Sequence, residues 1–425
     1  MLHAIIQAIT RRKDAKGLSR LRYFIAAMVL ILLTGLQPGG SGTHVIAQEA
    51  TQELPAPCDF RPTRLDQPWM RSGLSCLEEV VNMPEAGELA FTSLAVAPDS
   101  TLYAARPHSG EVFAFTDTDG DGMPDGPRMI ENELTLTDGD GDGLPDSPRV
   151  VAEGLTLPNG LDYHDGALYI AGGAHVYRWR AGELETLVDD LPTGGGFWTG
   201  GIAVGDDERI YVSTGAPCDF CASEDPVRGA VLSFALDGSD RQVVASGLRH
   251  PADLAFAGDD LWVVDSAREG LFDMPDLDEV NRVQPDADFG FPYCVGANVS
   301  DGAAGICEAV TPVIALPTGS TPTGIAAYRG NVIPSLQGKL LVALSGSYND
   351  LDLRGYMVVV ADPPTGTYEP LMPARPDDSA NSNFTTEEMN YRGSGFFPHR
   401  PIDVAVTEQG WVYISISGGR IILLR

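Results

Sequence analysis

Short apolar alternations separated by polar turns recur along most of the chain. The first reads SLAVAPDSTLYAA, in which two apolar alternations flank a turn that contains Pro and Asp. Five more copies follow, so that the six begin at Ser93, Gly160, Gly201, Asp253, Gly324 and Asp403. An alternation of period two, a turn with Gly, Asp or Asn, and a second alternation are typical of a β-hairpin. The pattern therefore predicts six hairpins.

The hairpins are spaced 41 to 79 residues apart, and further apolar strands such as EVFAF, HVYRW, AVLSF and MVVVA follow most of them. A hairpin with one or two more strands, repeated six times, is typical of a β-propeller. The sequence thus predicts an all-β fold, a six-bladed β-propeller with four-stranded antiparallel blades. A pair of β-sandwiches is the alternative, but it does not predict six similar hairpins.

The repeats divide the chain into three predicted parts. Residues 1–47 are expected to be a signal peptide, 48–84 an N-terminal extension, and 85–425 the propeller. Closing a propeller requires strands from both ends of the chain in one blade. We expect the last strand, RIILLR at 420–425, and the segment 88–92 to provide this closure.

The N-terminus carries six basic side chains before an apolar run of 13 residues, FIAAMVLILLTGL at 24–36. That run is short for a membrane span and suits a secretory signal. Val45 and Ala47 provide small side chains for cleavage before Gln48, and an uncleaved signal anchor is the alternative. The sequence therefore predicts a secreted or extracytoplasmic protein with no other membrane segment.

The exported part is strongly acidic. From Gln48 onwards the chain has 22 basic and 58 acidic side chains, a net charge of −36. Such a surface repels phosphate backbones, so nucleic acid is excluded as an expected partner. An acidic surface also suits divalent cations, although it serves solubility in many proteins.

All six cysteines lie in the exported part, where an even number indicates disulfides. Closeness in sequence favours the pairs Cys58–Cys76, Cys218–Cys221 and Cys294–Cys307. The CDFC segment could instead be half of a zinc site or a redox pair. It has no second CxxC and no βαβ pattern around it, so a structural bridge is favoured.

Two acidic loops, TDTDGDGMPD and TDGDGDGLPD, contain carboxylates at alternate positions followed by Gly. Ca²⁺ prefers six to eight oxygen ligands, and a chain winding around the ion provides them at this spacing. The predicted metal ligands are Asp117, Asp119, Asp121, Asp125, Asp138, Asp140, Asp142 and Asp146. Arg128 and Arg149 stand where an EF-hand has its bidentate Glu, so these are not EF-hands. Solvated acidic turns are the alternative. Both loops fall between predicted strands, which favours a structural role.

Several segments resemble the glucose/sorbosone dehydrogenase family. They are VVAEGLTLPNGLDYHDGALYIAGGAHVYRW, YVSTGAPCDFC, VVASGLRHPADLAF, DEVNRVQPDADFGFPYCVG and TPTGIAAYRG. The family resemblance extends from about Phe91 to Arg425 and implies a secreted six-bladed propeller. It also implies pyrroloquinoline quinone (PQQ) and Ca²⁺ as cofactors for the oxidation of sugars. The cofactor supplies the redox chemistry, while the protein supplies a base and orientation.

The resemblance also implies roles for particular residues. Arg249 in GLRHP and Arg400 near the last blade match cofactor-site positions, as do Phe197 and Trp198 in GGFWTG. In the DEVN segment, Glu279 matches a residue that helps to hold calcium.

The departures from the family pattern concern the same site. Relatives read GGHWTR, with a proton-abstracting His, where this chain has Phe197 and Gly200. A phenyl ring cannot accept a proton. Ser345 and Asp350 replace the ends of an HGSWNR motif, and Ile402 replaces a second Arg of some members. His250, next to Arg249, is the candidate substitute base.

Two functional hypotheses follow. The first is a PQQ-dependent sugar dehydrogenase that transfers hydride from a sugar hydroxyl or aldehyde to the quinone, with an altered base. The second is a catalytically impaired calcium-binding propeller that binds a glycan or a protein. A lactonase on the same fold lacks a clear set of carboxylates and His residues here.

Overall fold

The computed structural model of the chain describes residues 77–117, 123–130, 133–135, 147–268, 277–296, 298–300, 307–348, 354–373 and 399–425. All of these lie within one compact unit, Pro57–Arg425. The predicted signal peptide and the Cys58–Cys76 pair lie outside the described residues. Within the described ranges, no helix is long and apolar enough to cross a membrane.

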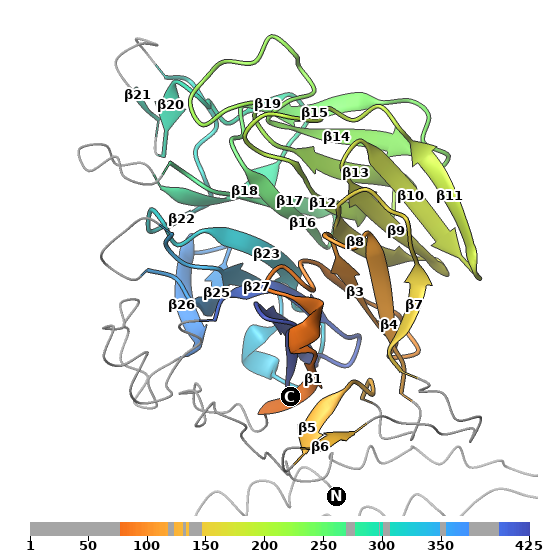
Figure 1. Cartoon of the computed structure of the whole chain (residues 1–425). Helices are drawn as coiled ribbons and strands as arrows, with labels where there is room; N and C mark the ends of the chain where they lie inside the picture. The colour runs from red at the N-terminus through yellow and green to blue at the C-terminus, as the bar shows by residue number, and fades with distance from the viewer. Residues whose placement is uncertain are drawn as a thin grey trace, which may run out of the picture. The chain divides into compact units, whose positions relative to one another are not determined.

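Six antiparallel sheets form the blades of a propeller. We number the blades 1 to 6 in chain order, and the colours of Figure 1 run in the same order. From the centre outwards, blade 1 consists of β2 (Leu94–Val96), β3 (Leu102–Arg106), β4 (Glu111–Phe115) and β7 (Arg149–Ala152). Blade 2 consists of β8 (Pro158–His164), β9 (Ala167–Gly172), β10 (His175–Arg180) and β11 (Glu183–Val188). Blade 3 consists of β12 (Thr199–Val204), β13 (Arg209–Thr214), β14 (Ala230–Ala235) and β15 (Gln242–Ser246), with the short β19 (Ala287–Asp288) at its edge.

The second half of the chain repeats this arrangement. Blade 4 consists of β16 (Pro251–Ala257), β17 (Asp260–Asp265), β18 (Asp278–Val283) and β22 (Ile314–Leu316). Blade 5 consists of β23 (Pro322–Ala327), β24 (Leu340–Leu344), β25 (Met357–Asp362) and β26 (Thr367–Met372). Blade 6 consists of β27 (Pro401–Val406), β28 (Val412–Ile416), β29 (Arg420–Leu424) and β1 (Leu77–Asn82). The predicted six-bladed β-propeller is therefore confirmed.

Blade 6 closes the ring by combining both ends of the described chain. β29 pairs with β28 on one side and with β1 on the other. The prediction that RIILLR takes part in closure is thus confirmed. The segment 88–92 does not provide the partner, because β1 occupies that place, and β1 lies within the range 48–84 expected to be an extension. Ion pairs Arg420–Glu79 at 2.5 Å and Arg425–Glu78 at 2.9 Å join the two strands.

The blades are apolar on both faces because each packs between two neighbours. β24, with the sequence LLVAL, is buried along its whole length. Leu341 and Ala343 pack towards blade 6, while Leu340, Val342 and Leu344 pack towards blade 4. Six such apolar clusters are present among the described residues, one between each pair of adjacent blades.

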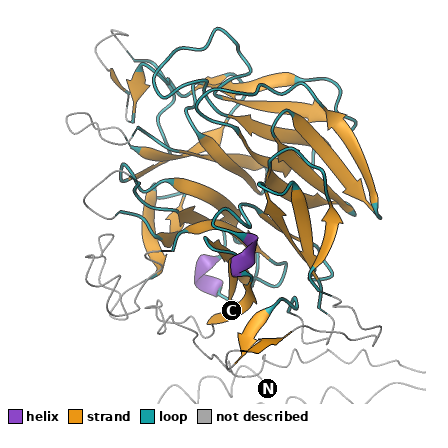
Figure 2. Cartoon of the chain, viewed as in Figure 1, coloured by secondary structure: helices purple, strands orange, loops and turns teal. Residues whose placement is uncertain are grey.

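Insertions lie in the connections between strands, where they leave the blades intact. The segment that carries both acidic loops links β4 to β7 and contains a small hairpin, β5 (Arg128–Ile130) and β6 (Glu133–Thr135). Another insertion, in blade 4, contains the hairpin β20 (Cys294–Val295) and β21 (Val299–Ser300). In the described part of the chain, helix is limited to two short 3-10 turns, η1 (Pro84–Ala86) and η2 (Pro334–Leu336), purple in Figure 2.

Candidate functional site

The loops that lead into the innermost strands carry the residues predicted for the cofactor site. We call this side of the propeller the entry face, defined by Phe197 and Trp198 before β12, Arg249 and His250 before β16, and Arg400 before β27. Blades 3, 4 and 6 thus contribute to it.

Phe197, Arg249 and His250 form one contact group on the entry face. The rings of Phe197 and His250 are stacked with their centroids 4.8 Å apart. The Cζ atom of Arg249 lies 4.5 Å from the centroid of the Phe197 ring. The structure therefore places His250, the candidate base, beside the ring of Phe197.

The imidazole of His250 is partly buried, and burial, with the charge of Arg249 as a second cause, lowers its pKa to about 4. At neutral pH the ring is thus uncharged. Its nitrogens make no hydrogen bond to any residue that the structure describes, whereas its main-chain N–H is bound. A neutral imidazole with a free lone pair is the form that can accept a proton.

Asp265, at the end of β17, holds the loop that carries both residues. Its two carboxylate oxygens accept hydrogen bonds from the main-chain N–H groups of Arg249, at 2.9 Å, and His250, at 2.6 Å. Asp265 is only 7% exposed. Asp265 was not predicted from the sequence, although its place at the end of the apolar strand DLWVVD was a signal for it.

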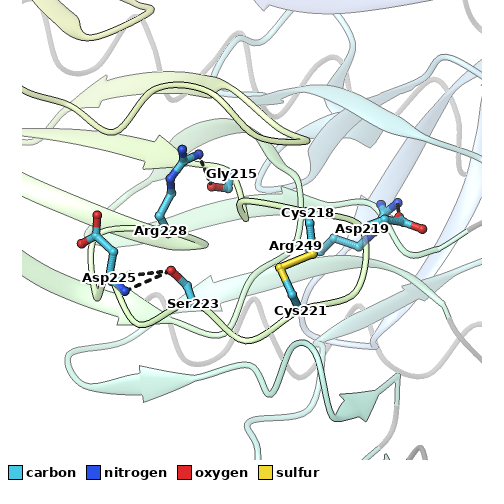
Figure 3. The surroundings of a disulfide bond; sticks show 8 residues. All are labelled: Gly215, Cys218, Asp219, Cys221, Ser223, Asp225, Arg228 and Arg249. Atoms are coloured by element: carbon cyan, nitrogen blue, oxygen red, sulfur yellow. Dashed lines mark hydrogen bonds and ion pairs between the residues drawn. A yellow bond between two sulfur atoms is a disulfide. The ribbon is translucent and has the colours of Figure 1, made fainter.

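Two sets of acceptors hold the guanidinium of Arg249. On one side, Nη1 donates to the main-chain oxygens of Ser266, at 2.7 Å, and Ala267, at 2.9 Å. On the other, Nε donates to Oδ1 of Asp219 at 3.2 Å and Nη2 forms an ion pair with the same atom. Asp219 lies in the loop closed by the Cys218–Cys221 disulfide, and Figure 3 shows Arg249 reaching it. One edge of Arg249 therefore already binds a carboxylate.

Arg400 is bound mainly by the main chain. Its Nη1 donates to the oxygens of Ser345, at 2.9 Å, and Gly346, at 2.6 Å, and its Nη2 donates to the oxygen of Ser347 at 3.0 Å. The guanidinium also lies over the ring of Tyr348, 3.8 Å from its centroid. These contacts use three of its five N–H donors, and all three acceptors are uncharged main-chain oxygens.

Exposed aromatic side chains accompany these groups. Trp198 is 52% exposed and Tyr348 is 60% exposed. Phe220, in the disulfide loop, is 46% exposed and lies under Arg268, whose Cζ is 4.1 Å from the ring centroid. Flat apolar faces of this kind suit the faces of sugars or planar heterocycles.

The DEVN segment begins β18 and lies behind the entry face. Asp278 is buried and accepts hydrogen bonds from the main-chain N–H of Ala267, at 2.8 Å, and Thr321, at 2.7 Å. Burial raises the pKa of Asp278 to about 7. Glu279, predicted to help hold calcium, accepts a hydrogen bond from the Asn281 amide at 2.8 Å. The observed contacts of Asp278 therefore fix loops, and the calcium role of Glu279 stays a prediction.

Two of the three predicted disulfides, Cys218–Cys221 and Cys294–Cys307, are present. Of the predicted calcium ligands, Asp117 and the buried Asp125 lie in described ranges. The other six (Asp119, Asp121, Asp138, Asp140, Asp142 and Asp146) lie outside them. Among the described residues, no group of three or more His, Cys, Asp or Glu side chains is placed to hold a metal ion. The calcium loops therefore stay a prediction.

Calcium removal is expected to destabilise the propeller if the acidic loops bind it. The loops join β4 to β7 within blade 1, so a bound ion stabilises the folded state through that blade. We expect a chelator to lower the melting temperature by a few degrees in scanning fluorimetry, and added Ca²⁺ to restore it. An unchanged melting temperature at micromolar residual Ca²⁺ would contradict a structural calcium role.

A cavity of about 790 Å³ lies along the C-terminal halves of the innermost strands, at the opposite end from the entry-face loops. All six blades line it, and three carboxylates stand in its wall: the half-buried Asp162 on β8 and Asp253 on β16, and the buried Asp403 on β27. None of the three carboxylates was predicted from the sequence. For Asp253 and Asp403 a signal exists in the residue that precedes the aligned aliphatic position of each hairpin. This residue is Asp in the fourth and sixth copies and Gly in three others.

Each of these carboxylates ties its blade to a neighbour. Asp162 accepts a hydrogen bond from the N–H of Val204 at 2.7 Å. Asp253 accepts one from the N–H of Ile325 at 2.8 Å, and Asp403 one from the N–H of Leu94 at 2.6 Å. The last bond links blade 6 to blade 1 across the closing seam.

Glycine makes room for two of these carboxyl groups. A Cβ atom on Gly201 would lie 2.3 Å from Oδ1 of Asp253, and one on Gly324 would lie 2.3 Å from Oδ1 of Asp403. No side chain fits at such a distance. The alternation of Asp and Gly at this position in the hairpins therefore follows from the packing around the axis.

The three carboxyls interact electrostatically. Burial raises the pKa of Asp162 to about 6 and that of Asp403 to about 7. Burial and the neighbouring charge of Asp403 raise the pKa of Asp253 well above its usual value. Asp253 and Asp403 also share a hydrogen bond, so the pair retains a proton at neutral pH.

Comparison with solved structures finds the same fold. The PQQ domain of pyranose dehydrogenase from Coprinopsis cinerea, in its holo form, aligns with a TM-score of 0.62 at 16% identity, covering 86% of this chain and 99% of that one. A calcium structure of a carbohydrate-active enzyme of family AA12 from Trichoderma reesei aligns with a TM-score of 0.61 at 15% identity, over 86% and 98% of the chains. Soluble aldose sugar dehydrogenase from Escherichia coli, in its apo form, gives 0.53 at 14% identity, over 82% and 98%.

The match by sequence covers less of the chain than the match by structure. No curated protein matches the chain by sequence. The glucose/sorbosone dehydrogenase family model matches residues 172–351, which include Phe197, Arg249 and His250 but not Arg400. Because this match and the propeller fold agree with the motifs quoted above, the resemblance of the chain to the glucose/sorbosone dehydrogenase family is confirmed.

Proposed function

We propose that the protein is a PQQ-dependent sugar dehydrogenase in which His250 takes the part of the missing family base. The observation that carries this proposal is the uncharged, unbonded imidazole of His250 beside Phe197 on the entry face. The substrate is a hydroxyl or aldehyde group of an aldose or a related sugar, for which the exposed indole of Trp198 offers a stacking surface.

The residues present fit a carboxylate-bearing quinone at Arg249. Its Nε–Nη2 edge binds a carboxylate already, that of Asp219, and Nη1 is fixed by two carbonyls so that the edge keeps its direction. Arg400 provides a second positive charge on the entry face, and the three donors that it uses bind uncharged main-chain oxygens. When bound, PQQ with Ca²⁺ supplies the acceptor for the hydride of the sugar carbon.

The protein's own part in the reaction is to move the hydroxyl proton. His250 accepts it on a ring nitrogen while Asp265 fixes the main chain that carries the imidazole. The positive charge of Arg249 lowers the pKa of His250 and so opposes its protonation. The same charge stabilises the negative charge that develops on the sugar oxygen as its proton leaves.

The role of His250 is testable by reconstitution of the full chain with PQQ and Ca²⁺. We expect His250→Ala to lower the rate of dye reduction with aldoses about 100-fold or more while PQQ affinity in a calorimetric titration stays within about twofold. Equal rates for the variant and the parent protein would exclude His250 as the base, and lack of PQQ binding at micromolar concentration would exclude the quinoprotein function.

The pH profile provides a second prediction. The base is active only when neutral, so kcat/KM is expected to fall below a pKa of about 4 and to be flat above it. In the double variant with Phe197→His and His250→Ala, the new imidazole should restore part of the rate. The pH below which kcat/KM falls should then move towards the ordinary His pKa of about 6.5. An acid limb that does not depend on His250 would contradict the assignment.

The second candidate function is binding of a glycan or protein without turnover. Phe197 in the place of the base, and the binding of Arg400 to main-chain oxygens, favour it. It predicts that the folded chain binds sugars through its exposed aromatic residues, with no dye reduction at saturating PQQ. Quenching of Trp fluorescence by oligosaccharides, lost in Trp198→Ala, would support it.

A further inference from the structure

We propose that Asp219 is an internal ligand of Arg249 which an incoming carboxylate must displace, so that the Asp219 side chain regulates access to the site. The Nε–Nη2 edge of Arg249 would then be a binding site for small anionic ligands that carry carboxylates, PQQ among them. This inference rests on the proposed function for its biological role, but the displacement itself is testable without turnover.

The two partners differ in how firmly they are held. The Arg249 side chain is 13% exposed, and two main-chain oxygens, those of Ser266 and Ala267, bind its Nη1. The Asp219 side chain is 70% exposed. Arg249 is therefore the fixed partner and Asp219 is the partner that can turn away into solvent.

The surrounding loop is anchored independently of this ion pair. The Cys218–Cys221 disulfide closes a ring of four residues around Asp219 and Phe220, as Figure 3 shows in part. Phe220 contacts the guanidinium of Arg268. Displacement of Asp219 thus requires rotation of one side chain and leaves the loop in place.

The geometry also defines the class of ligand. A guanidinium edge formed by Nε and Nη2 presents two parallel N–H groups, which match the two oxygens of a carboxylate. In this structure one oxygen, Oδ1 of Asp219, receives both bonds. A free carboxylate that aligns both oxygens with the edge makes a better pair, whereas a neutral sugar hydroxyl does not compete well with a charged acceptor.

The test measures affinity for two probes, PQQ and the redox-inert benzene-1,3,5-tricarboxylate, by calorimetric titration of the full chain in Ca²⁺. We expect Asp219→Asn to bind both about tenfold more tightly. In the parent protein the exposed Asp219–Arg249 ion pair competes with the probe and lowers the affinity for it by up to about fivefold. The variant also lacks the repulsion between the Asp219 carboxylate and the carboxylates of the probe, which raises the affinity further. The control is Glu224→Gln, which removes the same charge from the same exposed segment, because Glu224 has no hydrogen bond or ion pair to a described residue.

The outcomes separate the two proposals. If PQQ binds the parent protein and Asp219→Asn gains no more than Glu224→Gln, the displacement is wrong and the proposed function stands. If the variant gains affinity for the tricarboxylate but PQQ does not bind, the displacement stands and the proposed function is wrong. If neither probe binds the variant, both are wrong.

Discussion

Replacement of Asp265 by Asn is expected to weaken ligand binding at the entry face strongly and to destabilise the protein more than other single changes there. Both carboxylate oxygens of Asp265 accept main-chain N–H groups, those of Arg249 and His250. The amide of Asn can accept one of them, but its NH₂ group faces the other N–H and repels it. Each hydrogen bond to a buried charged acceptor contributes about 1.5–3 kcal/mol to the free energy of unfolding. A main-chain N–H that loses its acceptor stays desolvated, which destabilises the folded state further.

We therefore expect Asp265→Asn to lower the melting temperature by about 5–10 °C and the affinity for PQQ by about 100-fold. Both quantities are measurable on the same preparation, by scanning fluorimetry and calorimetric titration. In contrast to a substitution at His250, which removes only the base, this change moves the loop that carries Arg249 as well. Loss of affinity should therefore accompany loss of rate.

A matched control exists in the same strand. Asp260 begins β17, which Asp265 ends, and it forms a 3.6 Å ion pair with Arg282 in which both side chains are about half exposed. Such a pair contributes less than about 1 kcal/mol, so Asp260→Asn should change neither readout noticeably. If the two Asn variants behave alike, Asp265 does not position the loop.

The fold could be predicted from the sequence because each blade contains a local hairpin pattern that repeats along the chain. Each hairpin shows period-two alternation around a polar turn, and Gly201 to Thr214 gives two strands of blade 3 without ambiguity. The closing strand β1 was assigned wrongly, because LEEVVN is short and acidic and pairs with β29 more than 300 residues away. Its partners Arg420 and Arg425 meet Glu78 and Glu79 only in three dimensions.

The site was predicted only in part, and for a different reason. Family motifs identify Phe197, Arg249 and His250, which the structure brings into contact. No motif indicates that Asp219 binds Arg249 or that Asp265 holds the loop, because the partners lie 30 and 16 residues from Arg249 in sequence and meet it only in the folded chain. Asp253 and Asp403 were missed because each occupies a position that glycine occupies in other repeats, and Asp162 was missed because it occupies a position that alanine occupies in the others.

The pair Asp253 and Asp403 leads to the second large prediction, that stability falls as pH rises. Both pKa values are raised in the folded protein, so the folded state holds protons that the unfolded chain releases. Their stabilising effect is complete below the ordinary Asp pKa of about 4 and is lost as pH rises through about 7.

The groups that face this pair do not cancel the effect. Asp162, on β8, is also raised in pKa and adds to it, while His164 and Arg329 lower the pKa of Asp162 from the far end of the cavity. Melting curves of the parent protein between pH 5 and pH 9 should therefore show a continuous fall in melting temperature.

Asp253→Asn should reverse most of that fall, because Asn is close in shape to a protonated Asp. Its Oδ1 can accept the N–H of Ile325, and its NH₂ can donate to the Asp403 carboxylate in place of the shared proton. We expect the variant to melt within about 1 °C of the parent at pH 5 and about 5 °C higher at pH 9. Asp259→Asn, in the exposed turn after β16, removes the same charge and should have no such effect. A variant that is less stable than the parent at every pH would show instead that the carboxylates are ionised in the folded state and balanced by a cation.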